Sequence, residues 1–180
     1  MHEYTDRLAG RFAAVNADLE REFEARLVES STLAFRIAFS VLRHRQDAEE
    51  VAQEAFVKAY RRFTQLRDRD RFRAWLVRMT WRLAIDRQRH DRRRMAREQM
   101  YEPEPTPDAA DEAIARERAA QLWRAIDALP DKLRIVTVLA NIEGHDVADV
   151  ARLLGLPPGT VKSRLFLARQ RLKEHLQCTR

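Results

Sequence analysis

The sequence has few of the residues that mark extracellular, membrane or glycine-rich proteins. Its 180 residues include one cysteine, four glycines and six prolines. The single Cys178 excludes an internal disulfide and a cysteine-rich zinc site, which fits a reducing cytoplasm. The chain has no apolar run long enough to span a bilayer and its first residues lack an apolar signal core. We therefore expect no membrane insertion and a cytoplasmic location.

Scarce glycine, abundant Ala, Leu, Arg and Glu, and the lack of clear period-two runs predict an all-α fold. The segment from Tyr101 to Asp111 interrupts the helical pattern with three prolines and four acidic residues. Such a composition buries too little apolar area to fold alone, so we interpret it as a flexible linker. The chain is predicted to hold two separately folded small helical domains, 17–97 and 113–177, joined by a linker over 98–112.

Charge is segregated along the chain. Residues 67–97 hold twelve Arg against four Asp, residues 98–117 hold seven acids against one Arg, and residues 155–180 hold six Lys or Arg against one Glu. Two basic stretches therefore flank an acidic one. This layout is expected of two DNA-contacting modules joined by a tether that avoids DNA. Charges that only solubilise helix faces need no such segregation.

The run of residues 146–172 is typical of two helices separated by a tight turn. Asp146 is placed to cap the first helix, because its carboxylate can accept a free backbone N–H. Gly155 supplies the positive φ that often ends a helix. Pro158 suits the first position of the second helix, where no backbone N–H is needed.

The spacing of three residues in this run predicts a DNA-binding helix-turn-helix. Ala151, four residues before Gly155, lets the helices cross closely, and Val161, six residues after it, locks the second helix onto the first. An ordinary helical hairpin is the alternative, but few hairpins begin their second helix with so many polar and basic side chains. In such motifs the start of the second helix meets base edges in the major groove. The predicted DNA-binding residues are Thr160, Lys162, Ser163, Arg164, Phe166 and Arg169.

The first half shows three further helical patterns. One apolar stripe begins at Ala17, and a second, from Leu33 to Leu42, suggests another helix. Asp47 is predicted to open a third helix, with Glu50 completing a capping box. That helix carries the polar stripe Asp47, Glu50, Gln53 and Glu54. The stripe is either a solvated face or a docking surface for a basic protein.

A fourth helix is predicted from Phe72, with arginines around its polar surface. Trp81 falls off the apolar stripe of this helix and lies among arginines in the sequence. Aromatic faces beside guanidinium groups stack unpaired bases while neutralising phosphates. We therefore expect Trp81 to lie at the surface, although such a residue often only covers a neighbouring loop.

Two blocks of sequence resemble the extracytoplasmic-function (ECF) type of bacterial RNA polymerase sigma factor. DAEEVAQEAFVKAYRRF followed by FRAWLVRMTWRLAIDRQR is similar to sigma region 2. ALPDKLRIVTVLANIEG through GTVKSRLFLARQRL is similar to sigma region 4. The match runs from about Val28 to Leu172 in the family's order, with an acidic linker between the blocks.

The resemblance implies a promoter-specificity subunit that is not an enzyme and needs no cofactor or metal. It assigns the polar stripe at Asp47 to the β′ clamp helices of core RNA polymerase, and region 4 to the −35 DNA duplex and the β flap. It also implies an anti-sigma factor as a partner. The loop of residues 64–71 and the helix after it would melt the −10 element, where unstacking a base costs a few kcal/mol. The implied −10 residues are Arg71, Arg73, Arg78, Trp81, Arg82 and Arg89.

Three positions depart from the family pattern. Many members carry Asn where this chain has Arg82, which changes the expected base preference at −10. Many carry Arg where this chain has Leu167, which removes one DNA contact. His145 replaces an apolar residue, and we expect it to face solvent and to bind no metal.

Two other functions fit the sequence less well. A stand-alone helix-turn-helix regulator with a helical sensing domain would dimerise on palindromic sites. The charge on both halves and the lack of an apolar ligand box disfavour it. A nuclease would need clustered carboxylates, and the acids here lie on one helix face or in the linker.

Overall fold

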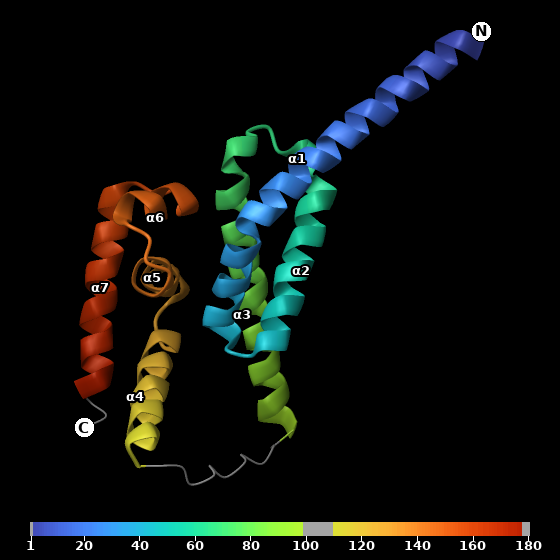
Figure 1. Ribbon diagram of the computed structural model, residues 1–180. Helices are drawn as coiled ribbons and strands as arrows, with labels where there is room; N and C mark the ends of the chain where they lie inside the picture. The colour runs from blue at the N-terminus through green and yellow to red at the C-terminus, as the bar shows by residue number, and fades with distance from the viewer. Residues whose placement is uncertain (1, 99–109, 178–180) are drawn as a thin grey trace.

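The computed structural model describes the backbone of residues 2–98 and 110–177 and the side chains of residues 17–95 and 116–177. The regular elements in these ranges are all helical, which confirms the all-α prediction. The first half holds α1 (His2–Leu42), α2 (Arg45–Arg62) and α3 (Phe72–Glu98), and the second holds α4 (Ala110–Asp127), α5 (Asp131–Thr137), α6 (Val147–Leu154) and α7 (Pro158–Gln177) (Figure 1). Short turns η1 (Phe63–Gln65), η2 (Arg69–Arg71) and η3 (Val138–Ile142) connect them.

The ends of the predicted linker are helical. Helix α3 runs to Glu98 and α4 begins at Ala110, so the described ends of the 98–112 segment belong to helices. The remainder of that segment lies outside the described residues. None of the described helices combines the length and the apolarity needed to cross a bilayer.

Helix α1 joins two apolar stripes that the sequence suggested were separate helices. It is continuous from His2 to Leu42. Phe23, Leu33, Ile37 and Val41 are buried along it. The prediction of two helices was wrong because the stripes follow one another along the helix, and no glycine or proline lies between Ala17 and Leu42.

Helix α2 begins two residues before the predicted start. Its cap is His44, whose Nδ1 accepts the backbone N–H of Asp47 at 3.4 Å. Asp47 therefore does not cap the helix, and the capping box predicted for Asp47 and Glu50 is wrong. Both carboxylates instead pair with Arg87 of α3. Arg87, on another helix, thus pairs with the two side chains that the local sequence pattern assigned to the helix cap.

Aromatic rings hold the first half together at one end. Phe23, Phe63 and Phe72 come from α1, η1 and the start of α3. Their ring centroids lie 5.2, 5.6 and 5.8 Å apart, and all three pairs meet edge to face. This is the preferred geometry for aromatic packing. The three rings fix the loop after α2, and with it the start of α3.

The helix-turn-helix forms as its local sequence predicts. The Asp146 carboxylate accepts the Asp149 N–H at 2.8 Å and caps α6. Gly155 has φ +66°, and the N–H of Leu156 donates to the Ala151 carbonyl at 2.9 Å, which closes the helix end. Helix α7 then begins at Pro158.

The two halves pack against each other through a shared apolar core. Val77, Trp81 and Ile85 of α3 join Ile37 and Val41 of α1 in this cluster. The second half contributes Ile135, Val136, Val138, Leu139, Val150, Ala151, Leu153, Val161 and Leu165. Figure 1 shows the second half lying along α3, with α2 on the opposite side. Both predicted bundles are present, and they meet through this shared cluster, which the sequence did not predict.

Trp81 is at the centre of this contact. Its side chain is only 6% exposed. The guanidinium of Arg134, from α5, lies 5.9 Å from its ring centroid. The predicted surface position of Trp81 is therefore wrong, because the second half covers the face of α3 from which it projects.

The π-helical turn η3 places a buried acid at the seam between the halves. Helix α5 widens into η3, whose Val138 and Leu139 are buried. The turn brings Glu143, whose side chain is 4% exposed, to 2.7 Å from Arg36 of α1. Burial raises the pKa of Glu143, and Arg36 offsets part of this effect.

Truncation of Trp81 tests the shared core. Trp81→Ala should lower the free energy of unfolding by about 3–5 kcal/mol, because it removes a large side chain packed from both halves. Phe166→Ala, at an exposed aromatic on α7, is the control and should change it by less than about 0.5 kcal/mol. Urea unfolding followed by circular dichroism measures both. Equal small effects would contradict the shared core.

Glu143 should give the folded chain a specific pH dependence. Because its pKa is raised above the ordinary 4.5, the folded state binds a proton more readily than the unfolded state between the two values. The stability of the parent relative to Glu143→Gln should therefore fall as the pH rises from 4.5. Paired urea titrations measure this difference, in which other groups cancel. A relative stability that rises with pH would contradict the buried position of Glu143.

Candidate nucleic-acid interface

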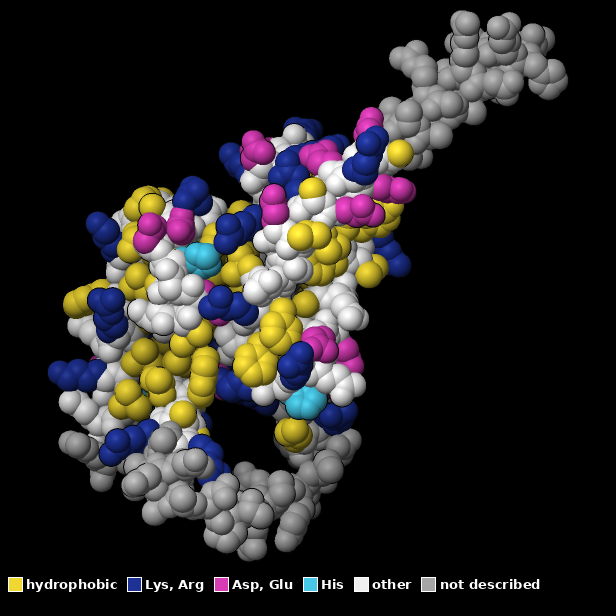
Figure 2. Space-filling model, in the orientation of Figure 1, with side chains coloured by type: hydrophobic (Ala, Val, Ile, Leu, Met, Phe, Trp, Pro, Cys, Tyr) yellow, Lys and Arg dark blue, Asp and Glu magenta, His cyan; other side chains and the backbone are white. Residues whose placement is uncertain are grey.

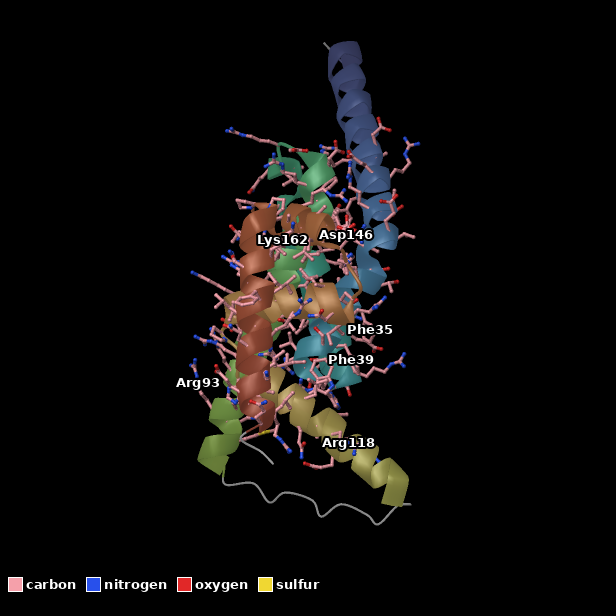
Figure 3. All side chains as sticks on the ribbon, turned by 90° about the vertical axis from the view of Figure 1, so that its left-hand side faces the viewer. Phe35, Phe39, Arg93, Arg118, Asp146 and Lys162 are labelled. Atoms are coloured by element: carbon pink, nitrogen blue, oxygen red, sulfur yellow. The ribbon has the colours of Figure 1, made fainter. Side chains whose placement is uncertain are left out.

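Helix α7 presents the predicted recognition face to solvent. Val161, Leu165 and Ala168 are buried against the rest of the second half. Lys162, in contrast, lies on the outward side of α7 (Figure 3). The exposed members of the predicted set are Lys162, Ser163, Phe166 and Arg169, while Thr160 and Arg164 are half-buried. The Ser163 hydroxyl donates to the Thr160 carbonyl at 3.0 Å, which orders the first turn of the helix.

Two consecutive residues of α7 expose large apolar side chains. Phe166 is 60% exposed and Leu167 is 48% exposed. Their exposure costs free energy unless a ligand or partner covers them. Leu167, which the sequence suggested was only a lost contact, therefore belongs to the same outward surface as Phe166.

Three of the predicted −10 arginines gather at one end of the seam. Arg71, Arg73 and Arg78 line a cavity of about 580 Å³ between the start of α3 and the turn after α6. Burial lowers the pKa of Arg78, and the neighbouring Arg82 and Arg71 lower it further. Arg78 also lies at the helix-turn-helix glycine, where its Nη1 would be 3.1 Å from a Cβ on Gly155. Asp68, Asp70 and Asp149 also line this cavity, and Asp68 lies 2.9 Å from Arg71, so four arginines there meet three carboxylates.

The opposite wall of this cavity was not predicted as functional. It is formed by His145, Asp149, Arg152, Leu153 and Gly155. Asp149 pairs with Arg152 on α6. Nothing in the local sequence pattern linked these residues to α3.

His145 is half-buried rather than solvent-facing. Its Nε2 atom is buried without a hydrogen-bond partner among the described residues. Burial lowers the pKa of His145, and Arg73 adds to the effect. The expectation of a solvent-facing His145 is wrong, because its half-buried side chain lines the cavity beside α3. Across the described ranges, no three His, Cys, Asp or Glu side chains gather in a way that could hold a metal.

The remaining members of the −10 set lie apart from this cavity. Arg82 is exposed on α3. Arg89, two turns further along α3, pairs with Asp131 of α5 at 2.6 Å. Trp81 is buried, as described above, and cannot stack a base in this arrangement. The structure thus spreads the predicted set along α3.

The acidic stripe lies on α2, the helix on the side of the first half away from the second half (Figure 1). Glu50, Gln53 and Glu54 are exposed, and Asp47 is half-buried. The stripe is partly neutralised by its neighbours: Arg87 lies 3.0 Å from Asp47 and 3.3 Å from Glu50. Burial lowers the pKa of the Arg87 guanidinium, but the carboxylates around Arg87 outweigh this effect and raise the pKa.

Lys and Arg side chains lie over both halves and along the border between them (Figure 2). The basic face of α3 and the basic start of α7 therefore belong to one molecule, with the acidic stripe of α2 on another side. Two nucleic-acid surfaces and one surface for a basic protein are the interactions that this distribution supports.

Two family models match the chain. Sigma-70 region 2 matches residues 27–94 and Sigma-70 region 4 matches residues 119–172. These ranges contain the acidic stripe, most of α3 and the helix-turn-helix.

Curated relatives and a solved structure agree with these models. The chain is 34% identical to the ECF RNA polymerase sigma factor SigE of Mycolicibacterium smegmatis over 79% of its own length and 56% of that protein, so it spans about half of this relative. It is 33% identical to the ECF RNA polymerase sigma factor SigM of Mycobacterium tuberculosis, over 76% of its own length and 68% of that protein. The structure of CnrH in complex with the cytosolic domain of CnrY matches with a TM-score of 0.61 and 26% identity, covering 88% of this chain and 90% of that one.

The order of the two regions, the helix-turn-helix geometry and the coverage of SigM agree with one another. The chain belongs to the ECF family of RNA polymerase sigma factors.

Proposed function

We propose that the chain binds core RNA polymerase, directs it to specific promoters through their −10 and −35 elements, and promotes melting of the DNA. The observation that carries this proposal is the presence, in one chain of the family, of an exposed recognition helix and an exposed acidic stripe on separate sides. One surface meets DNA while the other meets a protein, which is what a promoter-specificity subunit requires.

The DNA roles follow the exposed side chains. Lys162, Ser163, Phe166 and Arg169 read the −35 duplex, with Thr160 and Arg164 supporting the start of α7. Arg71, Arg73, Arg78, Arg82 and Arg89 neutralise the backbone of the opened −10 strand. Trp81 has no part in this proposal, because it is buried.

The protein partners follow from charge. Asp47, Glu50, Gln53 and Glu54 dock on the β′ clamp helices, and region 4 contacts the β flap. CnrH was solved with the cytosolic domain of CnrY, and the sigma factor RpoE was solved with the anti-sigma factor NepR from Bartonella quintana. We extend a partner of the second kind, an anti-sigma factor, to the present chain. In this role the chain acts in the cytoplasm and is not itself an enzyme.

Transcription in vitro tests the proposal. Core RNA polymerase with the purified chain should give promoter-dependent transcripts from genomic DNA that core enzyme alone does not give. Size-exclusion chromatography should show a complex of the chain with core enzyme. A free dimer that forms no such complex and gives no transcripts would instead indicate a stand-alone regulator.

Lys162 tests the recognition helix. Lys162→Ala should lower transcription from a responsive promoter about tenfold, because the residue lies at the end of α7 that meets base edges. Lys173→Ala is the matched control: it removes the same exposed charge about 16 Å further along α7 and should have little effect. Transcript yield at fixed salt concentration measures both. Equal losses would contradict a specific role for the start of α7.

Glu54 tests the docking stripe. Glu54→Lys should weaken binding to core polymerase about tenfold, because it places a cation against a basic partner. Glu24→Lys, the same change at an exposed acid of α1, should leave the affinity within about twofold. Competition binding with labelled parent chain measures both affinities. A Glu54 variant that binds like the Glu24 variant would remove α2 from the proposed interface.

A further inference from the structure

Asp127, the last residue of α4, lies in an unusual electrostatic position. A carboxylate at a helix C-terminus meets the negative end of the helix dipole, which is unfavourable. Its side chain is nevertheless only 11% exposed. Three guanidinium groups compensate it: Arg43 pairs with it, Arg134 lies at 2.6 Å and Arg92 lies at 3.4 Å. Contacts outside α4 therefore explain an acid at this position.

Two of these arginines come from the other half of the chain. Arg43 follows α1 and Arg92 lies on α3, whereas Arg134 belongs to α5. Arg43 has φ +54°, a left-handed conformation that non-glycine residues rarely adopt. Its guanidinium lies 4.9 Å from the Trp123 ring centroid, also on α4. Tertiary contacts thus hold Arg43 against the second half.

Asp131 makes a second contact of the same kind. It lies 2.6 Å from Arg89, one of the arginines assigned above to the −10 strand. Arg134 of α5, which is 3% exposed, also donates a hydrogen bond of 2.9 Å to the side chain of Gln88, the neighbour of Arg89 on α3. Carboxylates of the second half therefore pair with Arg43, Arg89 and Arg92 of the first.

We propose that Asp127 and Asp131 take the place of DNA phosphates and hold the chain in a closed, autoinhibited form. Carboxylate and phosphate oxygens accept the same charge-assisted hydrogen bonds from Arg. Arg89 and Arg92 lie in the most basic stretch of the sequence, residues 67–97, where a DNA strand would release counterions. The two aspartates and the DNA strand therefore compete for the same guanidinium groups. This inference rests on the proposed function for the identity of the competing ligand.

Incomplete neutralisation of the seam favours such competition. Three arginines of the first half and Arg134 of the second meet only Asp127 and Asp131 in these contacts. Burial lowers the pKa of Arg134, while Asp127 raises it and Arg43 and Arg92 lower it again. The residual positive charge leaves room for a polyanion that supplies more negative charge than two carboxylates do.

The closed form leaves the other two surfaces open. The acidic stripe of α2 and the outward face of α7 are exposed, whereas the second half lies along α3 (Figures 1 and 3). A closed chain can therefore meet polymerase and a −35 duplex before it opens. The order of events would be docking first and release of α3 second.

A distance measurement tests the latch in the full chain. Fluorophores at Val57→Cys on α2 and Gln177→Cys at the end of α7, in a Cys178→Ser background, report the separation of the halves. The variants are Asp127→Asn with Asp131→Asn, and Asp131→Asn alone, which changes an exposed side chain and spares the core. Glu117→Gln with Glu174→Gln is the control. It makes the same charge change at exposed acids of the second half, and Glu117 pairs within α4.

We expect the double Asp variant to show a longer separation than the control. It should also bind a mixed-sequence single-stranded oligonucleotide about fivefold more tightly than the control, and Asp131→Asn alone should give a smaller change in the same direction. An unchanged separation would overturn the latch. A longer separation with unchanged affinity, in a parent chain that binds the oligonucleotide, would overturn the competition. If no variant binds DNA with or without core polymerase, while the separation still responds, the proposed function fails and the latch stands.

Discussion

Burial of one face of α3 by the second half is the contact on which the structure depends. Val77, Trp81 and Ile85 supply the apolar part of this contact, and it closes a core that neither half completes alone. Arg134 joins the apolar and ionic parts, because its guanidinium lies over Trp81 and also pairs with Asp127. Burying such an ion pair is favourable only when its remaining hydrogen-bonding groups also find partners. The buried Nε of Arg134 has none among the described residues, so the apolar packing carries the contact.

The same contact separates the functional surfaces into two classes. The recognition side of α7 and the acidic stripe of α2 lie outside it and are available in the closed chain. The basic face of α3 lies beside it, and the arginines there are shared with carboxylates of the second half. In the proposed latch, regulation and promoter opening use the same charged groups, which would link the release of the second half to the arrival of DNA.

Local rules predicted the helix-turn-helix well and the rest of the chain less well. Asp146, Gly155 and Pro158 act within one turn of their own position, so capping and φ preferences fix the motif without help from elsewhere. Asp47 shows the limit of such rules, because Arg87 on another helix takes the carboxylate that a cap would have used. Trp81 shows it again: its place among arginines in the sequence indicated exposure, whereas a segment over fifty residues later covers it. The contacts of Asp127 follow from the same tertiary packing, and no sequence period marks them.

Hydroxyl-radical footprinting of the free full-length chain is the most direct test of this account. Reactivity at Trp81 reports whether the second half covers α3 in solution, and the exposed Phe166 serves as an internal reference. We expect Trp81 to be modified far more slowly than Phe166, after correction for the intrinsic reactivity of each ring. Comparable corrected rates at the two positions would show that the halves do not share a core, and would contradict the closed form.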